Sequence, residues 1–146
     1  MSDISEMIEG NVLIRASAGT GKTFSLATRF IRLMLFDGVD PERIVALTFS
    51  RAAAQEIYTA LLKRLWKAAE TEEGAAKERE NLLARLPESK RKILDARAID
   101  WSSKTFANLL GKVVSTQHTG AIATLDSFIL RLVGSFPLEM GFRNAP

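Results

Sequence analysis

The chain reads Val12-Leu13-Ile14-Arg15 and then Ala16-Ser17-Ala18-Gly19-Thr20-Gly21-Lys22-Thr23, before a long helical pattern begins. An apolar strand that enters a glycine-rich turn ending in Gly-Lys-Thr, at the start of a helix, is the context of a phosphate-binding loop. Polyphosphate is strongly hydrated, so a site has to replace that water with many donors at once. The stretch therefore predicts a site for a nucleoside triphosphate, with all eight residues of the second run at the ligand.

Each residue type in this stretch has a physical reason to be there. Gly19 and Gly21 permit backbone angles that turn successive N–H groups toward the phosphates, and the new helix adds free N–H groups and its dipole. Lys22 is expected to reach the β- and γ-phosphates, and the Thr23 hydroxyl to ligate Mg²⁺. The general pattern has glycine where this chain has Ala16. An ordinary glycine turn before a helix is the alternative.

Composition sets wide limits. The 146 residues, 47% of them apolar, suit one domain with a real core. The net charge of +3 is compatible with nucleic acid but does not show binding. Cysteine is absent, which excludes disulfides, thiolate zinc sites and cysteine-bound iron–sulfur clusters. No signal peptide or membrane span is evident, so we expect a cytoplasmic protein without membrane contact.

The pattern of apolar residues predicts an α/β fold. Strands alternate with helices, which favours a parallel sheet with flanking helices and right-handed crossovers. The residues between 70 and 100 suggest one or two surface helices broken near Pro87. Trp66 and Trp101 are expected in the core or between helices. The other predicted elements are strands at 11–15, 44–48 and 121–125, and helices at 22–36, 52–66, 105–114 and about 126–133.

Three segments resemble known motifs. Residues 13–24 resemble the first motif of superfamily 1 DNA helicases of the UvrD/Rep type, and most closely the RecB and AddA branch of helicase–nuclease subunits, which commonly carry alanine where Ala16 stands. Residues 46–57, Ala-Leu-Thr-Phe-Ser-Arg-Ala-Ala-Ala-Gln-Glu-Ile, are similar to the family's strand-to-helix DNA-contact motif. Residues 122–128, Ile-Ala-Thr-Leu-Asp-Ser-Phe, resemble a further contact segment, with Asp126 in place of the usual histidine.

The resemblance implies an ATP-dependent DNA helicase with a P-loop NTPase (RecA-like) fold. Its cofactors would be ATP and Mg²⁺, its substrate single-stranded or duplex DNA in repair or recombination, and its partners other helicase or nuclease subunits. Residues 1–146 would form a partial N-terminal ATP-binding domain, with a helical insertion at about 67–118 that carries no motif.

Some family features are missing from the chain. No Walker B Asp-Glu pair follows an apolar strand, and arginines from a second RecA-like domain, worth about 10³–10⁵ in rate, are not present. We therefore expect an incomplete first ATPase domain that alone binds nucleotide weakly and hydrolyses almost none. Its sheet is expected to expose edges and apolar surface, which favours a homodimer.

The second and third motifs predict a nucleic-acid interface. The hydroxyls of Thr48 and Ser50, where a strand ends, can take phosphates of a single strand together with nearby helix N–H groups. The resemblance adds Ser127 to this set. Phe49 could offer a ring on which a base stacks. The alternative is that Phe49 belongs to the core and Ser50 caps the helix.

Asp126 has three interpretations. It follows the mostly apolar run Ile122–Leu125, as a Walker B carboxylate does, and would then hold Mg²⁺ in a small stand-alone phosphoryl-transfer enzyme. The continuation Ser127-Phe128 favours the DNA-contact motif instead. Asp126 could also cap a helix that begins at Ser127. A non-catalytic phosphate-loop module remains a further alternative for the whole chain.

Overall fold

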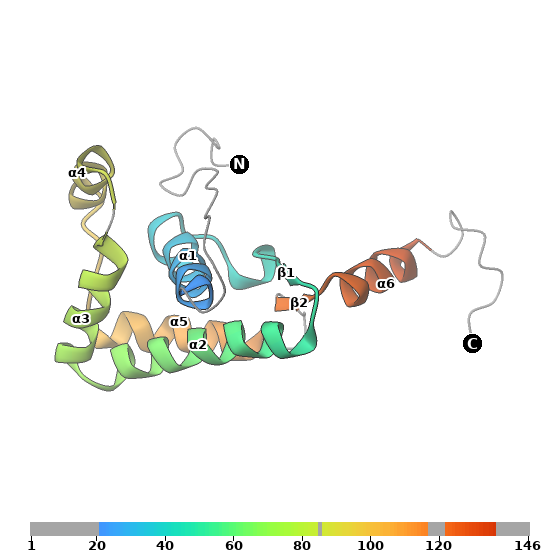
Figure 1. Ribbon diagram of the computed structural model, residues 1–146. Coiled ribbons are helices and arrows are strands. Elements are labelled where there is room, and N and C mark those ends of the chain that lie inside the picture. The colour runs from blue at the N-terminus through green and yellow to red at the C-terminus, as the bar shows by residue number, and fades with distance from the viewer. Residues whose placement is uncertain (1–20, 85, 117–121, 137–146) are drawn as a thin grey trace.

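The computed structural model describes residues 21–84, 86–116 and 122–136. Predictions for the strand at 11–15 and for the loop residues 16–20 lie outside this part. The described part is α/β and mostly helical (Figure 1). In chain order its elements are α1 (Lys22–Phe36), η2 (Pro41–Arg43), β1 (Ala46–Thr48), α2 (Arg51–Glu70), α3 (Glu72–Leu83), α4 (Glu88–Ala96), α5 (Ser103–Ser115), β2 (Ile122–Thr124) and α6 (Leu125–Ser135).

The strands β1 and β2 pair in parallel, as the alternating pattern predicted. Their register places Ala46 opposite Ile122 and Thr48 opposite Thr124. Both are shorter than predicted. Ile44 caps the end of η2, because its backbone N–H donates to the carbonyl of Pro41 at 3.1 Å, and it is therefore not part of β1. Leu125 is the first residue of α6 and therefore not part of β2.

The predicted helices are all present, and hydroxyl groups cap the starts of several of them. The hydroxyl of Ser50 accepts the N–H of Ala53 at 3.1 Å and starts α2. The hydroxyl of Thr71 accepts the N–H of Gly74 at 3.0 Å and starts α3, so α2 runs on to Glu70 rather than ending at Trp66. α3 and α4 are separate helices on either side of Pro87, which confirms the predicted break.

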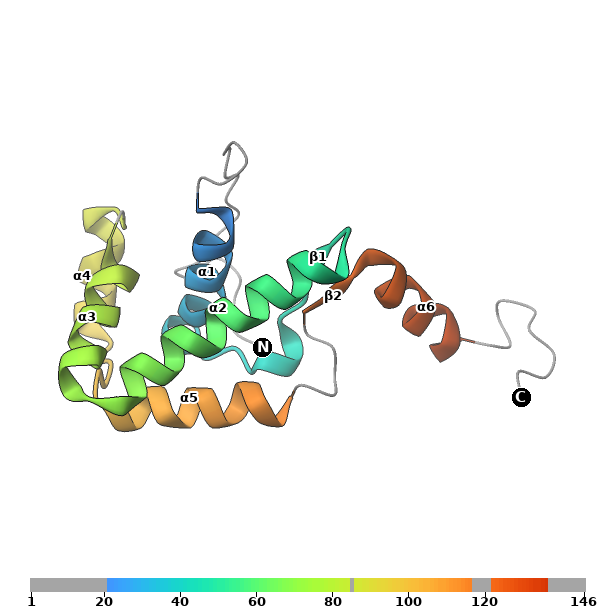
Figure 2. The ribbon, with the colours of Figure 1, turned by 60° about the horizontal axis from the view of Figure 1, so that its bottom comes forward.

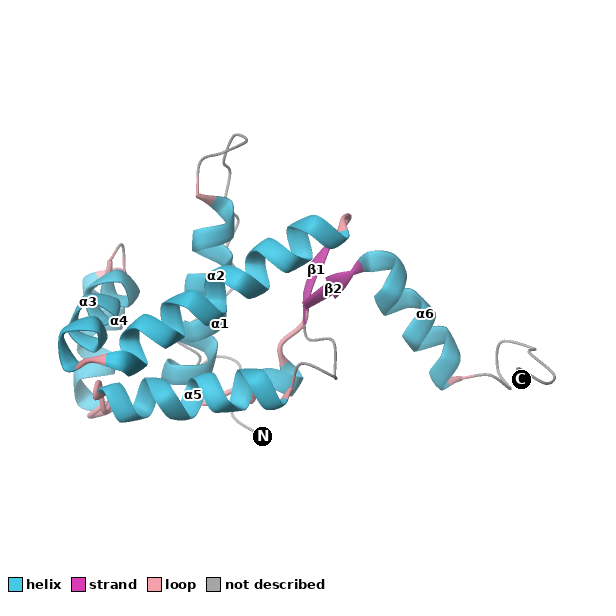
Figure 3. Cartoon of the chain, turned by 90° about the horizontal axis from the view of Figure 1, so that it is seen from below, coloured by secondary structure: helices cyan, strands magenta, loops and turns pink. Residues whose placement is uncertain are grey.

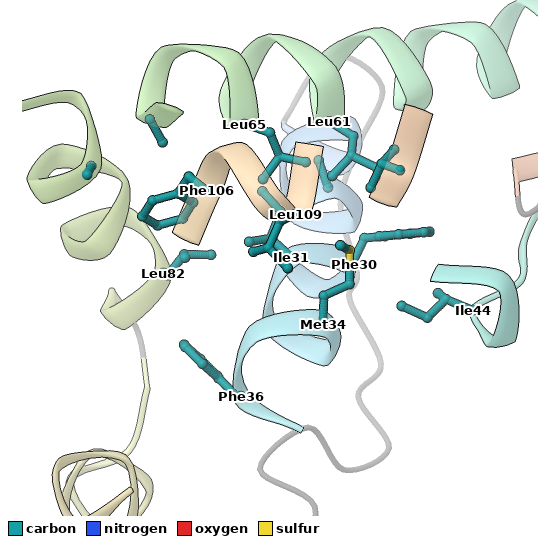
Figure 4. Packing of buried hydrophobic residues seen from close by; sticks show 14 of the residues in the cluster. Phe30, Ile31, Met34, Phe36, Ile44, Leu61, Leu65, Leu82, Phe106 and Leu109 are labelled. Atoms are coloured by element: carbon teal, nitrogen blue, oxygen red, sulfur yellow. The ribbon is translucent and has the colours of Figure 1, made fainter. Parts of the chain in front are cut away.

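The core lies between α1, α2 and α5, with α3 closing one side (Figure 4). Figure 2 shows α2 and α5 lying close together near α3 and diverging toward the strands, while α1 crosses α2. The largest fully buried side chains come from all four helices and are Ile31, Leu61, Leu65, Leu82 and Phe106. Since α3 and α5 belong to the long connection between β1 and β2, that connection supplies much of the core.

The two tryptophans differ from each other. Trp101 is half-buried, and its ring meets that of Phe36 edge to face at a centroid distance of 6.0 Å, which confirms its predicted place against the core. The prediction for Trp66 is wrong, because this side chain is 63% exposed. Neighbouring helical residues point about 100° apart, and Leu65 already occupies the core-facing position of α2.

Helix α6 stands apart from this core. Figures 1 and 3 show it extending away from the end of β2, and none of its residues is buried. Its exposed apolar side chains fit the predicted apolar surface, and the homodimer stays a prediction. They are Leu125, Ile129, Leu130 and Leu132. No helix within the described ranges combines the length and apolar character that a bilayer span needs.

The burial difference on α2 gives a direct test of the core. We expect Leu65→Ala to lower the free energy of unfolding by about 2–5 kcal/mol, because it removes a fully buried side chain and leaves a cavity. The adjacent control Trp66→Ala is expected to cost less than about 1 kcal/mol, since the side chain is largely in water. Urea unfolding of both variants, followed by circular dichroism, measures the difference. Equal losses would contradict the placement of these residues.

Candidate functional site

The first turn of α1 is the described end of the predicted phosphate loop. Gly21 has φ +84°, a left-handed angle that suits glycine, and a Cβ built there meets nothing within 4 Å. Its carbonyl accepts the N–H of Ser25 at 2.9 Å, so helical bonding begins at once. The N-cap residue, Gly21, has no side chain with which to cap the helix, and no acidic residue lies in the first turn. These features are compatible with an anion at the start of α1, whose role stays a prediction.

Lys22 and Thr23 lie in this first turn. Lys22 is exposed and Thr23 half-buried. Within the described ranges no group of three or more His, Cys, Asp or Glu side chains could hold a metal. A single hydroxyl fits Mg²⁺ that is bound mainly through phosphates and water, which is how this ion usually binds. The roles of Ala16 to Thr20 stay predictions.

A second group of predicted residues lies at one end of the two strands. Thr48 and Thr124 end β1 and β2 opposite each other. The hydroxyl of Thr48 donates to the carbonyl of Ser50 at 2.7 Å. The hydroxyl of Thr124 accepts the N–H of Ser127 at 3.3 Å and starts α6. The pairing therefore brings the starts of α2 and α6 to the same edge of the sheet.

Phe49 is 92% exposed, so the alternative that places it in the core is wrong. The ring lies between the end of β1 and the start of α2, on a turn whose neighbours are polar. The alternative that Ser50 caps a helix is confirmed by its bond to Ala53. A capping hydroxyl still has a hydrogen to donate, so capping does not exclude contact with a phosphate.

Beside this edge lies a cavity of about 350 Å³. Thr124 and Ser127 line it, together with residues from α2, α5 and α6, whereas Thr48, Phe49 and Ser50 do not. Its other polar side chains are Arg51, Gln55, Tyr58, Thr116 and Arg131. The predicted interface is thus divided between the strand end and an adjoining hollow.

Arg51, Tyr58 and Arg131 were not singled out from the sequence. Arg51 follows the Thr-Phe-Ser segment directly, and Arg131 lies one helical turn after Ser127, with its Nε 3.4 Å from the Ser127 carbonyl. Both positions can be seen in the sequence and could have identified these two arginines as candidate contact residues. Burial raises the pKa of Tyr58 above its ordinary value of 10.0, so its hydroxyl stays protonated at neutral pH and can donate. Together they give the cavity two cations and a neutral donor.

Asp126 is exposed in the first turn of α6. The helix begins at Leu125 and is capped by Thr124, so the interpretation of Asp126 as the cap of a helix from Ser127 is wrong. A carboxylate in a first turn is favoured by the helix dipole. Its interpretations as a Walker B carboxylate and as part of a DNA-contact motif both stay predictions.

A family model of the UvrD/REP helicase N-terminal domain matches residues 2–143. An ATP-dependent helicase/nuclease subunit from Lacticaseibacillus casei is 32% identical over 137 residues, which is 91% of this chain and 9% of the relative. A probable DNA helicase II homolog from Mycoplasma genitalium is 42% identical over 55 residues, 38% of this chain and 8% of the relative. The chain thus spans less than a tenth of the length of these relatives.

Proposed function

Because the chain belongs to the UvrD/REP helicase N-terminal domain family, we propose that it forms the N-terminal, ATP-binding part of an ATP-dependent DNA helicase. Two observations on the described residues support the proposal. A helix start without a capping side chain follows Gly21, and two further helix starts meet at the carboxyl ends of parallel strands. In open parallel sheets, ligands bind at this end of the strands.

The nucleotide would bind along residues 16–23. Backbone N–H groups of the loop and of the first turn of α1 hold the phosphates, and the Lys22 ammonium pairs with the β- and γ-phosphates. The Thr23 hydroxyl would hold Mg²⁺, which when bound offsets charge on the phosphates. These groups bind and orient the triphosphate.

Single-stranded DNA would lie across the ends of β1 and β2. The hydroxyls of Ser50 and Ser127 would donate to backbone phosphates, and that of Thr48 would do so after releasing the Ser50 carbonyl. The exposed ring of Phe49 would stack on a base. The guanidinium groups of Arg51 and Arg131, on the wall of the adjoining cavity, supply positive charge for the same strand.

The wider architecture follows from the same family. We propose that residues 1–146 belong to a RecA-like domain and that residues 67–118 are a helical insertion within it. In the parent helicase, ATP turnover would close this domain against a second RecA-like domain and move it along DNA. Helicase or nuclease subunits are proposed as partners and the cytoplasm as the location.

The nucleotide site is tested with Lys22→Ala in the 146-residue chain. We expect Mg-ATP binding, measured by isothermal titration calorimetry, to weaken about 10- to 100-fold, because a hydrogen bond to a charged group is worth about 1.5–3 kcal/mol. Lys77→Ala removes the same charge from an exposed position on α3 and should leave the affinity unchanged. Equal affinity in both variants would refute the site.

The DNA interface is tested with fluorescently labelled oligothymidine and anisotropy. Phe49→Ala is expected to weaken binding by about 1–3 kcal/mol through lost stacking. Arg51→Ala should weaken it and lower the slope of log affinity against log salt by about one, since one phosphate contact is lost. The control Lys92→Ala removes an exposed charge on α4, away from the strand ends. An effect of Lys92→Ala as large as that of Arg51→Ala would indicate nonspecific charge attraction.

A further inference from the structure

A buried ionic cluster joins three helices near the start of α1. Arg64 of α2 and Glu78 of α3 form an ion pair, with only 11% and 6% of their side chains exposed. Both carboxylate oxygens of Glu78 accept from the Nε of Arg64, at 3.1 and 3.3 Å, and its Nη2 donates to Oε1 as well. The amide of Asn81 also donates to Glu78, at 3.4 Å. Glu78 therefore fixes the plane of the guanidinium.

The other side of that guanidinium holds α1. Its Nη1 donates to the carbonyl of Phe24 at 3.1 Å and to the hydroxyl of Thr28 at 2.6 Å. The Thr28 hydroxyl in turn donates to the Phe24 carbonyl at 2.8 Å. The guanidinium carbon also lies 4.2 Å from the centre of the Phe24 ring. The first two turns of α1 are thus held by two hydrogen bonds, to Phe24 and to Thr28, and by a cation stacked on the Phe24 ring.

Stability alone is a weak reason for such a cluster. Replacing a buried ion pair with apolar side chains of similar volume is often neutral or stabilising. What apolar side chains do not supply is direction, because arginine presents donors in a rigid planar fork. Arg64 uses that fork to join Glu78 to one specific carbonyl of α1.

That carbonyl belongs to Phe24, the residue directly after Lys22 and Thr23. Fixing it sets both the rotation of α1 about its axis and its position along that axis. At the other end of α1, Arg97 donates to the carbonyl of Phe36 at 2.6 Å, so the helix is held at both ends. Reactive groups misplaced by only 1 Å can lose about 100-fold in rate, so the direction of the first turn matters.

We infer that Arg64, oriented by Glu78, is a positioning residue for the triphosphate site: it holds the first turn of α1 so that the Lys22 ammonium and the Thr23 hydroxyl face the phosphates and Mg²⁺. This inference rests on the proposed function of that turn. It gives α3, within the segment that carries no motif, a role in building the nucleotide site.

The test separates positioning from stability by removing both charges together. Arg64→Met alone leaves Glu78 buried without its partner and is expected to destabilise the chain. The double variant Arg64→Met, Glu78→Met has no unpaired charge and should keep a thermal midpoint near that of the unsubstituted chain. The matched control Lys112→Met, Asp40→Met removes an exposed ion pair with a 3.4 Å separation, between α5 and the start of η2.

Affinity is measured by titration with Mg-ATP, and with ATP in EDTA. We expect the double variant to bind Mg-ATP about tenfold more weakly or worse, and the gain in affinity from Mg²⁺ to shrink, because the Thr23 hydroxyl is displaced. The control should match the unsubstituted chain in both measurements. Arg64→Lys, which keeps the charge but loses the fork, should fall between them.

The outcomes are decisive. A double variant that folds and binds Mg-ATP as tightly as the unsubstituted chain, with the same Mg²⁺ gain, overturns the positioning role while Lys22-dependent binding leaves the proposed function standing. A chain whose ATP binding does not depend on Lys22 overturns the proposed function, and the positioning role with it. If Arg64→Met lowers both the Mg-ATP affinity and the thermal midpoint, and the double variant restores both, Arg64 has a structural role only and the positioning role is overturned.

Discussion

Parallel pairing of β1 with β2 is the constraint on which the rest of the described structure depends. Parallel strands cannot be joined by a tight turn, so a crossover connection has to link them. Here that connection contains α2, α3, α4 and α5, and each of these helices contributes buried side chains to the core around α1. The same pairing sets Thr48 opposite Thr124, which brings the starts of α2 and α6 to one edge. The crossover that supplies the core and the candidate interface at the strand ends thus both accompany the same strand pairing.

Much of this arrangement was predictable because its causes are local. A hydroxyl residue before an apolar periodic run marks a helix start, and Ser50, the cap considered from the sequence, accepts the N–H of Ala53 there. Thr71 and Thr124, which cap α3 and α6, were not identified in this way. The apolar residues Ala27, Ile31 and Met34 recur at helical spacing along α1, and all three are buried. Family resemblance, which the match over residues 2–143 confirms, rested on short motifs whose residues are close in sequence.

The rest depends on contacts between distant segments, and local patterns do not contain them. Phe24 has the spacing of a core residue, yet its side chain is half exposed, and the Arg64 guanidinium rather than the apolar core lies against its ring. Arg64 and Glu78 look like ordinary charges of a solvated helix face, and only the packing of α3 against α2 buries both. Arg51 and Arg131 likewise share a cavity only because the two strands pair.

The isolation of α6 has a mechanical consequence. The helix has 11 residues and, within the described ranges, meets the rest mainly at β1 and β2. At about 1.5 Å per residue it is about 16 Å long. A rotation of about 10° at its first turn would therefore move its far end by about 3 Å. A ligand bound at the strand ends beside Thr124 would contact the start of α6. A small rotation there would move the apolar far end of the helix by a larger distance than the start.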